Sequence, residues 1–206
     1  KDKIVFLGKF KSLIDTKSNT VTKLLKLLRD KHIIKQKAFN IIVKKNIPHG
    51  SGLGGASSDA AALLNFFKSK INKKMKKNGI YKLANKIGSD VSLCLEQKNS
   101  LITGKKFNII RLNSRFKFNI LIVFAKIICP TKKVYLKNRQ FSSKKFVSQQ
   151  ILNNKKKLIN YLRNEHNDLE KTVINMYPKI GRVISLISEQ KGCYLSRLTG
   201  SGSACI

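Results

Sequence analysis

Acidic side chains are scarce in this chain of 206 residues: 10 Asp and Glu stand against 43 Lys and Arg, for a formal net charge of +33. Such a balance is typical of proteins that bind nucleic acids or anionic surfaces. The positive residues are mostly Lys mixed with Asn and Ile, without an Arg-rich, aromatic-interleaved strip or zinc-finger spacing. We therefore interpret the charge as a solvated basic coat, and a basic RNA-binding protein is the alternative.

Cysteine, histidine and long apolar runs are also sparse. The 4 cysteines form no C-x-x-C pair and the 3 histidines complete no metal-ligand cluster, which favours a reduced cytoplasm and predicts no metal site built by protein ligands. The longest apolar run, residues 120–129, is interrupted by Lys126 and is too short to cross a bilayer, so we expect no membrane span. A hydrophobic content of 42% indicates a globular protein of one or two domains.

Apolar periodicity predicts both strands and helices along the chain. A polar stretch near residues 112–117 predicts a boundary between two domains, 1–113 and 114–206. Asn19 is the expected N-cap of the first helix, and Pro178 is expected near the start of the last. The predicted strands are 3–10, 38–44, 118–124 and the C-terminal residues, and the predicted helices are 20–30, 58–69, 81–87, 144–164 and 176–189.

The stretch IPHGSGLGGASSDAA, residues 47–61, places four glycines between a predicted strand and a predicted helix. Glycines let successive N–H groups turn toward one point, and the start of a helix adds unpaired amides and the positive end of its dipole. Ser57 and Ser58 are expected to be N-caps that could also bind a phosphate or a metal-bound water. Because one or two glycines would suffice for a tight turn, the pattern favours a phosphate-binding loop.

Three well-known glycine motifs do not account for this loop. Gly50, Gly52 and Gly55 satisfy G-x-G-x-x-G, but no Asp or Glu occurs between Asp59 and Asp90 to bind a ribose, as a dinucleotide-binding fold requires. A P-loop needs Gly-Lys-Ser/Thr after its glycines, which is absent here. No H-R-D or D-F-G follows, so the protein-kinase pattern is absent as well.

The loop resembles that of the GHMP kinase superfamily, Pro-x-x-x-Gly-Leu-Gly-x-Ser-Ser-Ala, with an additional residue before the Ser pair. Four further stretches are similar to the family in order and spacing: NTVTKLLKLLR, IGSDVSLCL, CPTKKVY, and NDLEKTVINMYPKI leading to LTGSGSA. The longer loop is similar to the members that phosphorylate the 2-hydroxyl of a cytidine diphosphate-linked methylerythritol in non-mevalonate isoprenoid biosynthesis. Mevalonate and homoserine kinases usually lack the insertion, and a mevalonate-type kinase is the alternative within the family.

The resemblance implies an α+β fold with an N-terminal domain like ribosomal protein S5 and a ferredoxin-like C-terminal domain, with the active site between them. It implies ATP and Mg²⁺ as cofactors and a small-molecule substrate. The charge pattern and the short apolar runs predict neither a nucleic-acid nor a membrane partner. Asp90 in GSDV would be the catalytic base, although Ser92 replaces the usual proline, and an ordinary turn cap is the alternative. The implied nucleotide-binding residues are Pro48, His49, Gly50, Ser51, Gly52, Leu53, Gly54, Gly55, Ala56, Ser57 and Ser58.

The same resemblance implies substrate-binding residues in the second half of the chain: Thr131, Tyr135, Gly200, Ser201 and Gly202. The Tyr135 ring would stack on cytosine, and packing in the core is the alternative. Lys45 and His49 would flank the adenine side. Asn167 and Asp168 are interpreted as a structural pair that starts a helix.

Three parts of the family pattern have no counterpart in this sequence. They are an N-terminal Pro-x-Lys-x-Asn strand, a following Gly-Tyr-His segment, and the last strand after Ile206. The chain also begins with Lys1 rather than Met. We therefore expect it to be a fragment that is inactive by itself.

Overall fold

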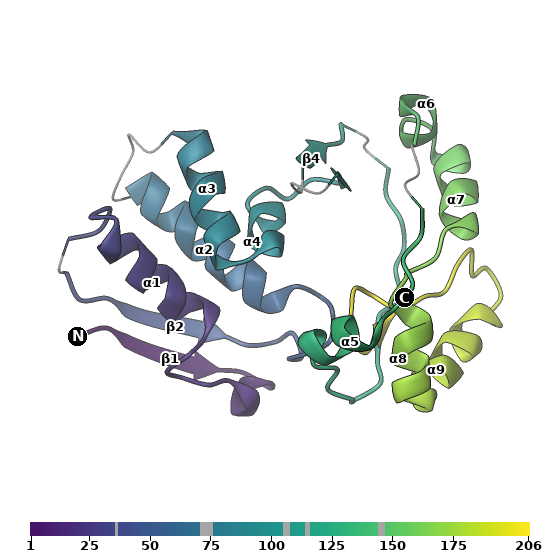
Figure 1. Cartoon of the computed structure of the whole chain (residues 1–206), viewed down its shortest axis with the longest axis horizontal. Helices are drawn as coiled ribbons and strands as arrows, with labels where there is room; N and C mark the ends of the chain where they lie inside the picture. The colour runs from purple at the N-terminus through teal and green to yellow at the C-terminus, as the bar shows by residue number, and fades with distance from the viewer. Residues whose placement is uncertain (36, 71–75, 105–107, 114–115, 144–146) are drawn as a thin grey trace. The chain divides into compact units, whose positions relative to one another are not determined.

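A computed structural model describes residues 1–35, 37–70, 76–104, 108–113, 116–143 and 147–206 (Figure 1). The chain forms two compact units, one of residues 1–49 and 54–111, the other of residues 50–53 and 112–206. Both units combine helices with short strands, which confirms the α+β class. Residues 50–53 of the glycine-rich loop pack with the second unit, although the chain on both sides of them belongs to the first.

The first unit is built on a parallel pair of strands, β1 and β2, which pair from Lys3 opposite Asn40 to Leu7 opposite Lys44. A second pair, β3 and β4, is antiparallel. The elements of this unit are β1 (Lys3–Leu7), the 3-10 helix η1 (Lys11–Leu13), α1 (Thr20–Asp30), β2 (Asn40–Lys44), α2 (Gly55–Lys70), α3 (Lys77–Ile87), α4 (Ser89–Cys94), β3 (Ser100–Thr103) and β4 (Asn108–Arg111).

Helix α1 shows how local sequence forms this unit. Asn19 accepts hydrogen bonds from the N–H groups of Val21 and Thr22, and the Thr22 hydroxyl accepts one from the Asn19 N–H, so the first turn is capped as expected. Its apolar positions recur at helical spacing and are buried against α2 and α3. The core of the unit includes Val21, Leu24, Leu25, Leu28, Leu64, Phe67, Ile80 and Leu83.

The second unit has a small antiparallel pair in which Val123 lies opposite Cys205. Its core includes Cys129, Val134, Val173, Ile180 and Leu198. The elements are β5 (Val123–Phe124), α5 (Thr131–Lys137), α6 (Gln149–Leu152), α7 (Lys155–Asn164), α8 (Glu170–Met176), α9 (Pro178–Ser188) and β6 (Ala204–Cys205).

Several predicted elements differ in extent. The expected strand 118–124 is wrong except at β5, because β6 pairs only with Val123 and Phe124. Outside that pair Ile120 and Leu121 are 64% and 61% exposed. The expected helix 144–164 is divided, since Asn154 caps a new helix by accepting from the Lys157 N–H; residues 144–146 lie outside the described part. The helix predicted from 176 begins at Pro178, after α8 has ended at Met176. No helix in the described part of the chain is long and apolar enough to cross a membrane.

Candidate active site

The glycine-rich loop joins β2 to α2 through three left-handed glycines. Gly50, Gly52 and Gly54 have φ values of 68°, 81° and 69°, a region that residues with a Cβ rarely adopt. They meet different surroundings. A Cβ on Gly54 would meet no atom within 4 Å, so this glycine faces open space. A left-handed glycine beside open space at the start of a helix is compatible with a main-chain anion site.

Helix α2 begins at Gly55, earlier than expected. Ser57 and Ser58 are therefore residues of the first turn, and their interpretation as N-caps is wrong. The Ser58 N–H already donates to the Gly54 carbonyl at 2.9 Å. The amides of the residues before Ser58 have no carbonyl one turn earlier within the helix, and they lie at its positive end. The start of α2 thus offers main-chain donors and two hydroxyl groups in the same turn.

The second glycine turn, residues 199–203, packs directly against the loop. A Cβ on Gly52 would lie 2.0 Å from the Thr199 carbonyl oxygen, and a Cβ on Gly202 would lie 1.9 Å from the Ser51 carbonyl carbon. The Ser51 carbonyl accepts from the Ala204 N–H at 3.0 Å and from the Thr199 hydroxyl at 3.2 Å. Only glycine fits at both 52 and 202. The structure therefore brings two glycine motifs, far apart in the sequence, into main-chain contact.

Helix α5 contributes to the same unit. The Ser201 hydroxyl lies 3.0 Å from the Thr131 hydroxyl, which places Thr131 beside the second glycine turn. Val134 is fully buried and orients the helix, while Tyr135 is 53% exposed. The alternative interpretation of Tyr135 as a core residue is therefore wrong. Its exposed ring could stack on a base.

Asn167 holds the second glycine turn, a role that the sequence alone does not reveal. Its amide donates to the carbonyls of Gly200 at 2.7 Å and Leu198 at 3.1 Å. Its oxygen accepts from the Leu169 N–H at 3.0 Å, next to the start of α8, so the expected role at a helix start is also present. Glu170 adds a hydrogen bond from the Leu198 N–H at 2.7 Å. No local pattern could reveal these contacts, because the turn lies about 30 residues further along the chain.

Asp90 lies in the first turn of α4 and is exposed. The Ser89 hydroxyl donates to its carboxylate at 3.4 Å, and the residue at the N-cap position is Gly88. Asp90 is therefore not the cap of this helix, contrary to the alternative interpretation. An exposed carboxylate at the start of a short helix is accessible to a ligand.

The opposite end of α4 is capped by Arg111, a role that no sequence motif indicates. One terminal nitrogen of its guanidinium donates to the carbonyls of Leu93 at 2.8 Å and Glu96 at 3.3 Å, and the other donates to the Ser92 carbonyl at 2.9 Å. The Ser92 and Leu93 carbonyls belong to the last turn of α4, where a helix leaves its carbonyls unpaired. Arg111 thus fixes the short helix that carries Asp90.

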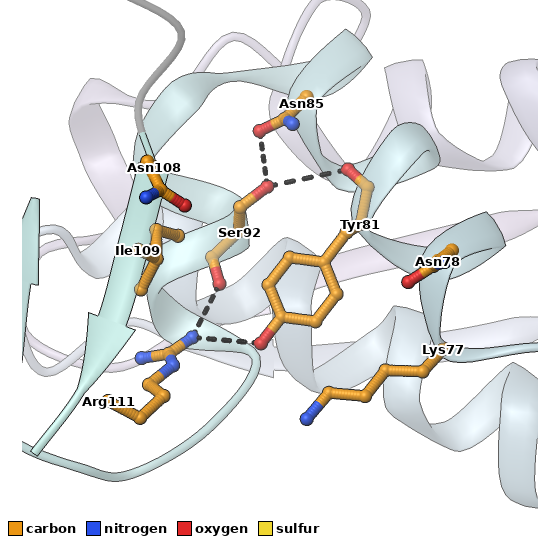
Figure 2. Close-up of a pocket in the computed structure, with 8 residues that line it drawn as sticks. All are labelled: Lys77, Asn78, Tyr81, Asn85, Ser92, Asn108, Ile109 and Arg111. Carbon is orange, nitrogen blue, oxygen red and sulfur yellow. Dashed lines mark hydrogen bonds between the residues drawn. The ribbon is translucent and has the colours of Figure 1, made fainter. Parts of the chain in front are cut away.

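A cavity of about 500 Å³ lies beside this cap (Figure 2). The second terminal nitrogen of Arg111 also donates to the Tyr81 hydroxyl at 3.2 Å, and that hydroxyl donates to Glu96 at 2.7 Å. Hydrogen bonds from the Lys77 ammonium and the Tyr81 hydroxyl lower the pKa of Glu96 to about 2. The cavity is lined by Lys77, Asn78, Tyr81, Asn85, Ser92, Asn108, Ile109 and Arg111.

Lys45 does not lie free beside the loop. It is 7% exposed, and its ammonium is 2.5 Å from the Asp59 carboxylate. His49, by contrast, is exposed. In the described part of the chain no group of three or more His, Cys, Asp or Glu could hold a metal ion.

Comparison with known proteins accounts for both units. Residues 19–98 match the N-terminal domain of the GHMP kinases and residues 149–206 match their C-terminal domain. The chain therefore belongs to the GHMP kinase family, a family of ATP-dependent phosphotransferases. It is 39% identical over 206 residues to the 4-diphosphocytidyl-2-C-methyl-D-erythritol kinase of Pelagibacter ubique (strain HTCC1062), covering 99% of this chain and 71% of that protein.

The same kinase from Parvibaculum lavamentivorans is 30% identical over 196 residues, which cover 91% of this chain and 65% of that protein. The chain thus spans about two thirds of the length of these relatives. Two crystal structures share the fold: a 4-(cytidine 5'-diphospho)-2C-methyl-D-erythritol kinase, with a TM-score of 0.69 and 22% identity, and the homoserine kinase of Cytophaga hutchinsonii, with 0.70 and 15%. The first alignment covers 99% of this chain and 72% of the other, and the second covers 100% of this chain and 71% of the other.

Proposed function

We propose that this chain belongs to an ATP-dependent kinase that phosphorylates the 2-hydroxyl of 4-diphosphocytidyl-2-C-methyl-D-erythritol. The named relatives support this substrate, and both domains of the family are represented in the chain. The observation that carries the proposal is the packing of the loop at Ser51 and Gly52 on the turn at Gly202. Neither an RNA-binding protein nor a mevalonate kinase is favoured by these findings.

Binding of the polyphosphate is assigned to the loop of residues 48–58. Phosphoryl transfer depends mainly on positioning and charge neutralisation, and main-chain amides at a helix start provide both. Gly54 supports this assignment, because it leaves open space before the first turn of α2. Mg²⁺ would be held by phosphate oxygens together with the hydroxyls of Ser57 and Ser58, which lie in the first turn of α2. When bound, the ion would neutralise charge that develops on the transferred group.

Asp90 is assigned the role of general base. Its carboxylate would accept the proton of the acceptor hydroxyl as that oxygen bonds to the terminal phosphorus of ATP and the bond to the bridging oxygen breaks, releasing ADP. Its exposure supports this role, and the Arg111 cap supports a fixed orientation of α4.

Recognition of the substrate is assigned to Thr131, Tyr135 and the turn Gly200 to Gly202. The hydroxyl pair of Thr131 and Ser201 offers adjacent polar groups for a diphosphate or sugar hydroxyl. The exposed Tyr135 ring offers a face on which cytosine can stack.

The proposal is tested by measuring ATP consumption by the gene product that contains this chain. The rate of ATP consumption would be compared with three substrates at the same saturating concentration: 4-diphosphocytidyl-2-C-methyl-D-erythritol, mevalonate and homoserine. We expect turnover with the cytidylyl substrate alone. Turnover with mevalonate or homoserine at a comparable rate would refute the substrate assignment, and tight RNA binding that ATP does not affect would refute the kinase assignment.

A further inference from the structure

The Lys45 and Asp59 pair links the two ends of the glycine-rich loop. Lys45 follows directly after β2, and Asp59 lies in the second turn of α2. The Lys45 ammonium and the Asp59 carboxylate are 2.5 Å apart, with side chains 8% and 25% exposed. Lysine is rarely buried unless it is paired, so this position is held by its partner. The pair therefore crosses the base of the loop.

The main chain of Lys45 is anchored as firmly as its side chain. Its N–H donates to the Leu7 carbonyl at 2.7 Å, and its carbonyl accepts from the Phe10 N–H at 3.1 Å. Gly8 allows this close approach, since a Cβ there would lie 2.7 Å from the Lys45 carbonyl oxygen. Because the Lys45 backbone is held by these bonds, its ammonium can fix the position of α2 relative to β1 and β2.

Two neighbouring contacts act at the same place. The Ile47 side chain packs on Gly55, where a Cβ would lie 3.0 Å from it. The Thr20 hydroxyl donates to the Ala56 carbonyl at 2.9 Å. The first turn of α2 is thus held from the loop side and from α1, while Asp59 holds the second turn.

We propose that Lys45 and Asp59 are positioning residues that fix the start of α2 relative to the end of β2, so that the amides of the loop are preorganised for a polyphosphate. This inference rests on the proposed function. The pair also solves an electrostatic problem, because an unneutralised carboxylate one turn into α2 would repel the phosphates and offset the positive potential that the start of the helix offers them. Lys45 cancels that charge and acts through Asp59 rather than by touching the nucleotide.

The test compares the gene product that contains this chain with three variants of it. Lys45→Met leaves Asp59 unpaired, and Lys45→Met with Asp59→Leu replaces the pair by apolar side chains of similar reach, a replacement that buried ion pairs often tolerate. Arg29→Met is the matched control, because Arg29 makes a bidentate ion pair with Asp2 in the same unit, away from the loop. Hydrogen exchange of amides 46–49 and 54–58 would be measured without nucleotide, and ATP affinity by titration calorimetry.

We expect Lys45→Met to accelerate exchange in these segments and to weaken ATP binding about tenfold. The ATP affinity of the double variant should lie within about threefold of that of the unchanged chain. If the single variant does not fold, the affinity of the double variant tests the inference. Arg29→Met should change neither quantity. Unchanged exchange in Lys45→Met, or a double variant that binds as weakly as the single one, would overturn the inference; the second result would assign Lys45 a direct contact with the nucleotide. Faster exchange in a chain that binds no ATP at all would uphold the positioning role and refute the proposed function.

Discussion

Gly202 lies against the main chain of Ser51, so closely that a Cβ at position 202 would be 1.9 Å from the Ser51 carbonyl carbon. We expect Gly202→Ala to lower the free energy of unfolding by about 3 kcal/mol or more, because two backbone segments would have to separate. Urea unfolding followed by circular dichroism measures this loss. Gly192→Ala is the control, since Gly192 has a φ of 85° and open space around it, and it should cost only about 1 kcal/mol. Equal losses in the two variants would contradict the close packing.

A comparison of Gly54→Ala with Gly104→Ala separates an effect on ATP binding from an effect on stability. Gly54 and Gly104 have φ values of 69° and 70°, and a Cβ on either would meet nothing within 4 Å. Gly54→Ala and Gly104→Ala should therefore lose a similar stability, about 1 kcal/mol each. We expect ATP affinity to fall at least about tenfold in Gly54→Ala alone, because the new methyl group would enter the space assigned to the phosphates. Equal ATP affinity in both variants would place the polyphosphate elsewhere.

Asn167 should contribute through its amide donors. Asn167→Asp retains an oxygen for the Leu169 N–H but removes both donors to the carbonyls of Leu198 and Gly200. We expect a loss of about 1–3 kcal/mol in unfolding free energy, the cost of leaving such acceptors unpaired. Asn99→Asp, at an exposed position outside the helices and strands, is the comparison and should be nearly neutral. If Asn167→Asp is equally neutral, the turn does not depend on Asn167.

In the gene product that contains this chain, Asp90→Asn should remove nearly all turnover and leave nucleotide binding nearly intact. Removal of a general base lowers rates by about 10²–10⁴-fold, while the amide preserves the size of the side chain. Steady-state kinetics and ATP titration together measure the two effects. Asp30→Asn, at an exposed position on α1, is the control and should retain full activity. Persistent turnover in Asp90→Asn would show that another group accepts the proton.

The lowered pKa of Glu96 should make the free energy of unfolding depend on pH. Its pKa is lowered from 4.5 to about 2 by hydrogen bonds from Lys77 and Tyr81. A depressed pKa in the folded state stabilises the protein above the unfolded value, and this contribution is lost as the pH falls from about 4.5 through about 2. The difference in unfolding free energy between the unchanged chain and Glu96→Gln should therefore shrink over that range. Glu189→Gln, at an exposed position, should show no such change; a constant difference for Glu96→Gln would refute the assignment.

Features that depend on neighbours in the sequence were predictable. Helix α1 was predicted with its observed bounds because its apolar period and its Asn19 cap lie within one segment. The strand–loop–helix order around the four glycines was predicted for the same reason, but the start of α2 was not. The serine pair is the stronger local cap signal, whereas the structure begins the helix at Gly55.

The strand predicted at 118–124 failed for a different reason. Its apolar residues fit a strand, but a strand forms only where another strand supplies hydrogen-bond partners, and β6 supplies them at Val123 and Phe124 alone. The family resemblance named the residues of both glycine motifs. Their contact comes from the structure: the Thr199 hydroxyl donates to the Ser51 carbonyl, 148 residues away in the sequence.

The amino-acid sequence by itself determined the family, the helices with strong local signals, and the glycine and serine residues of the loop, since each rests on residue types at short or regular spacing. Tertiary structure alone decided that Asn167 holds the second turn, that Arg111 caps the helix of Asp90, and that Lys45 is neutralised by Asp59. Those contacts join side chains to distant partners whose identity no local pattern encodes. Their energies depend on burial and on hydrogen-bond geometry, which exist only once the chain has folded.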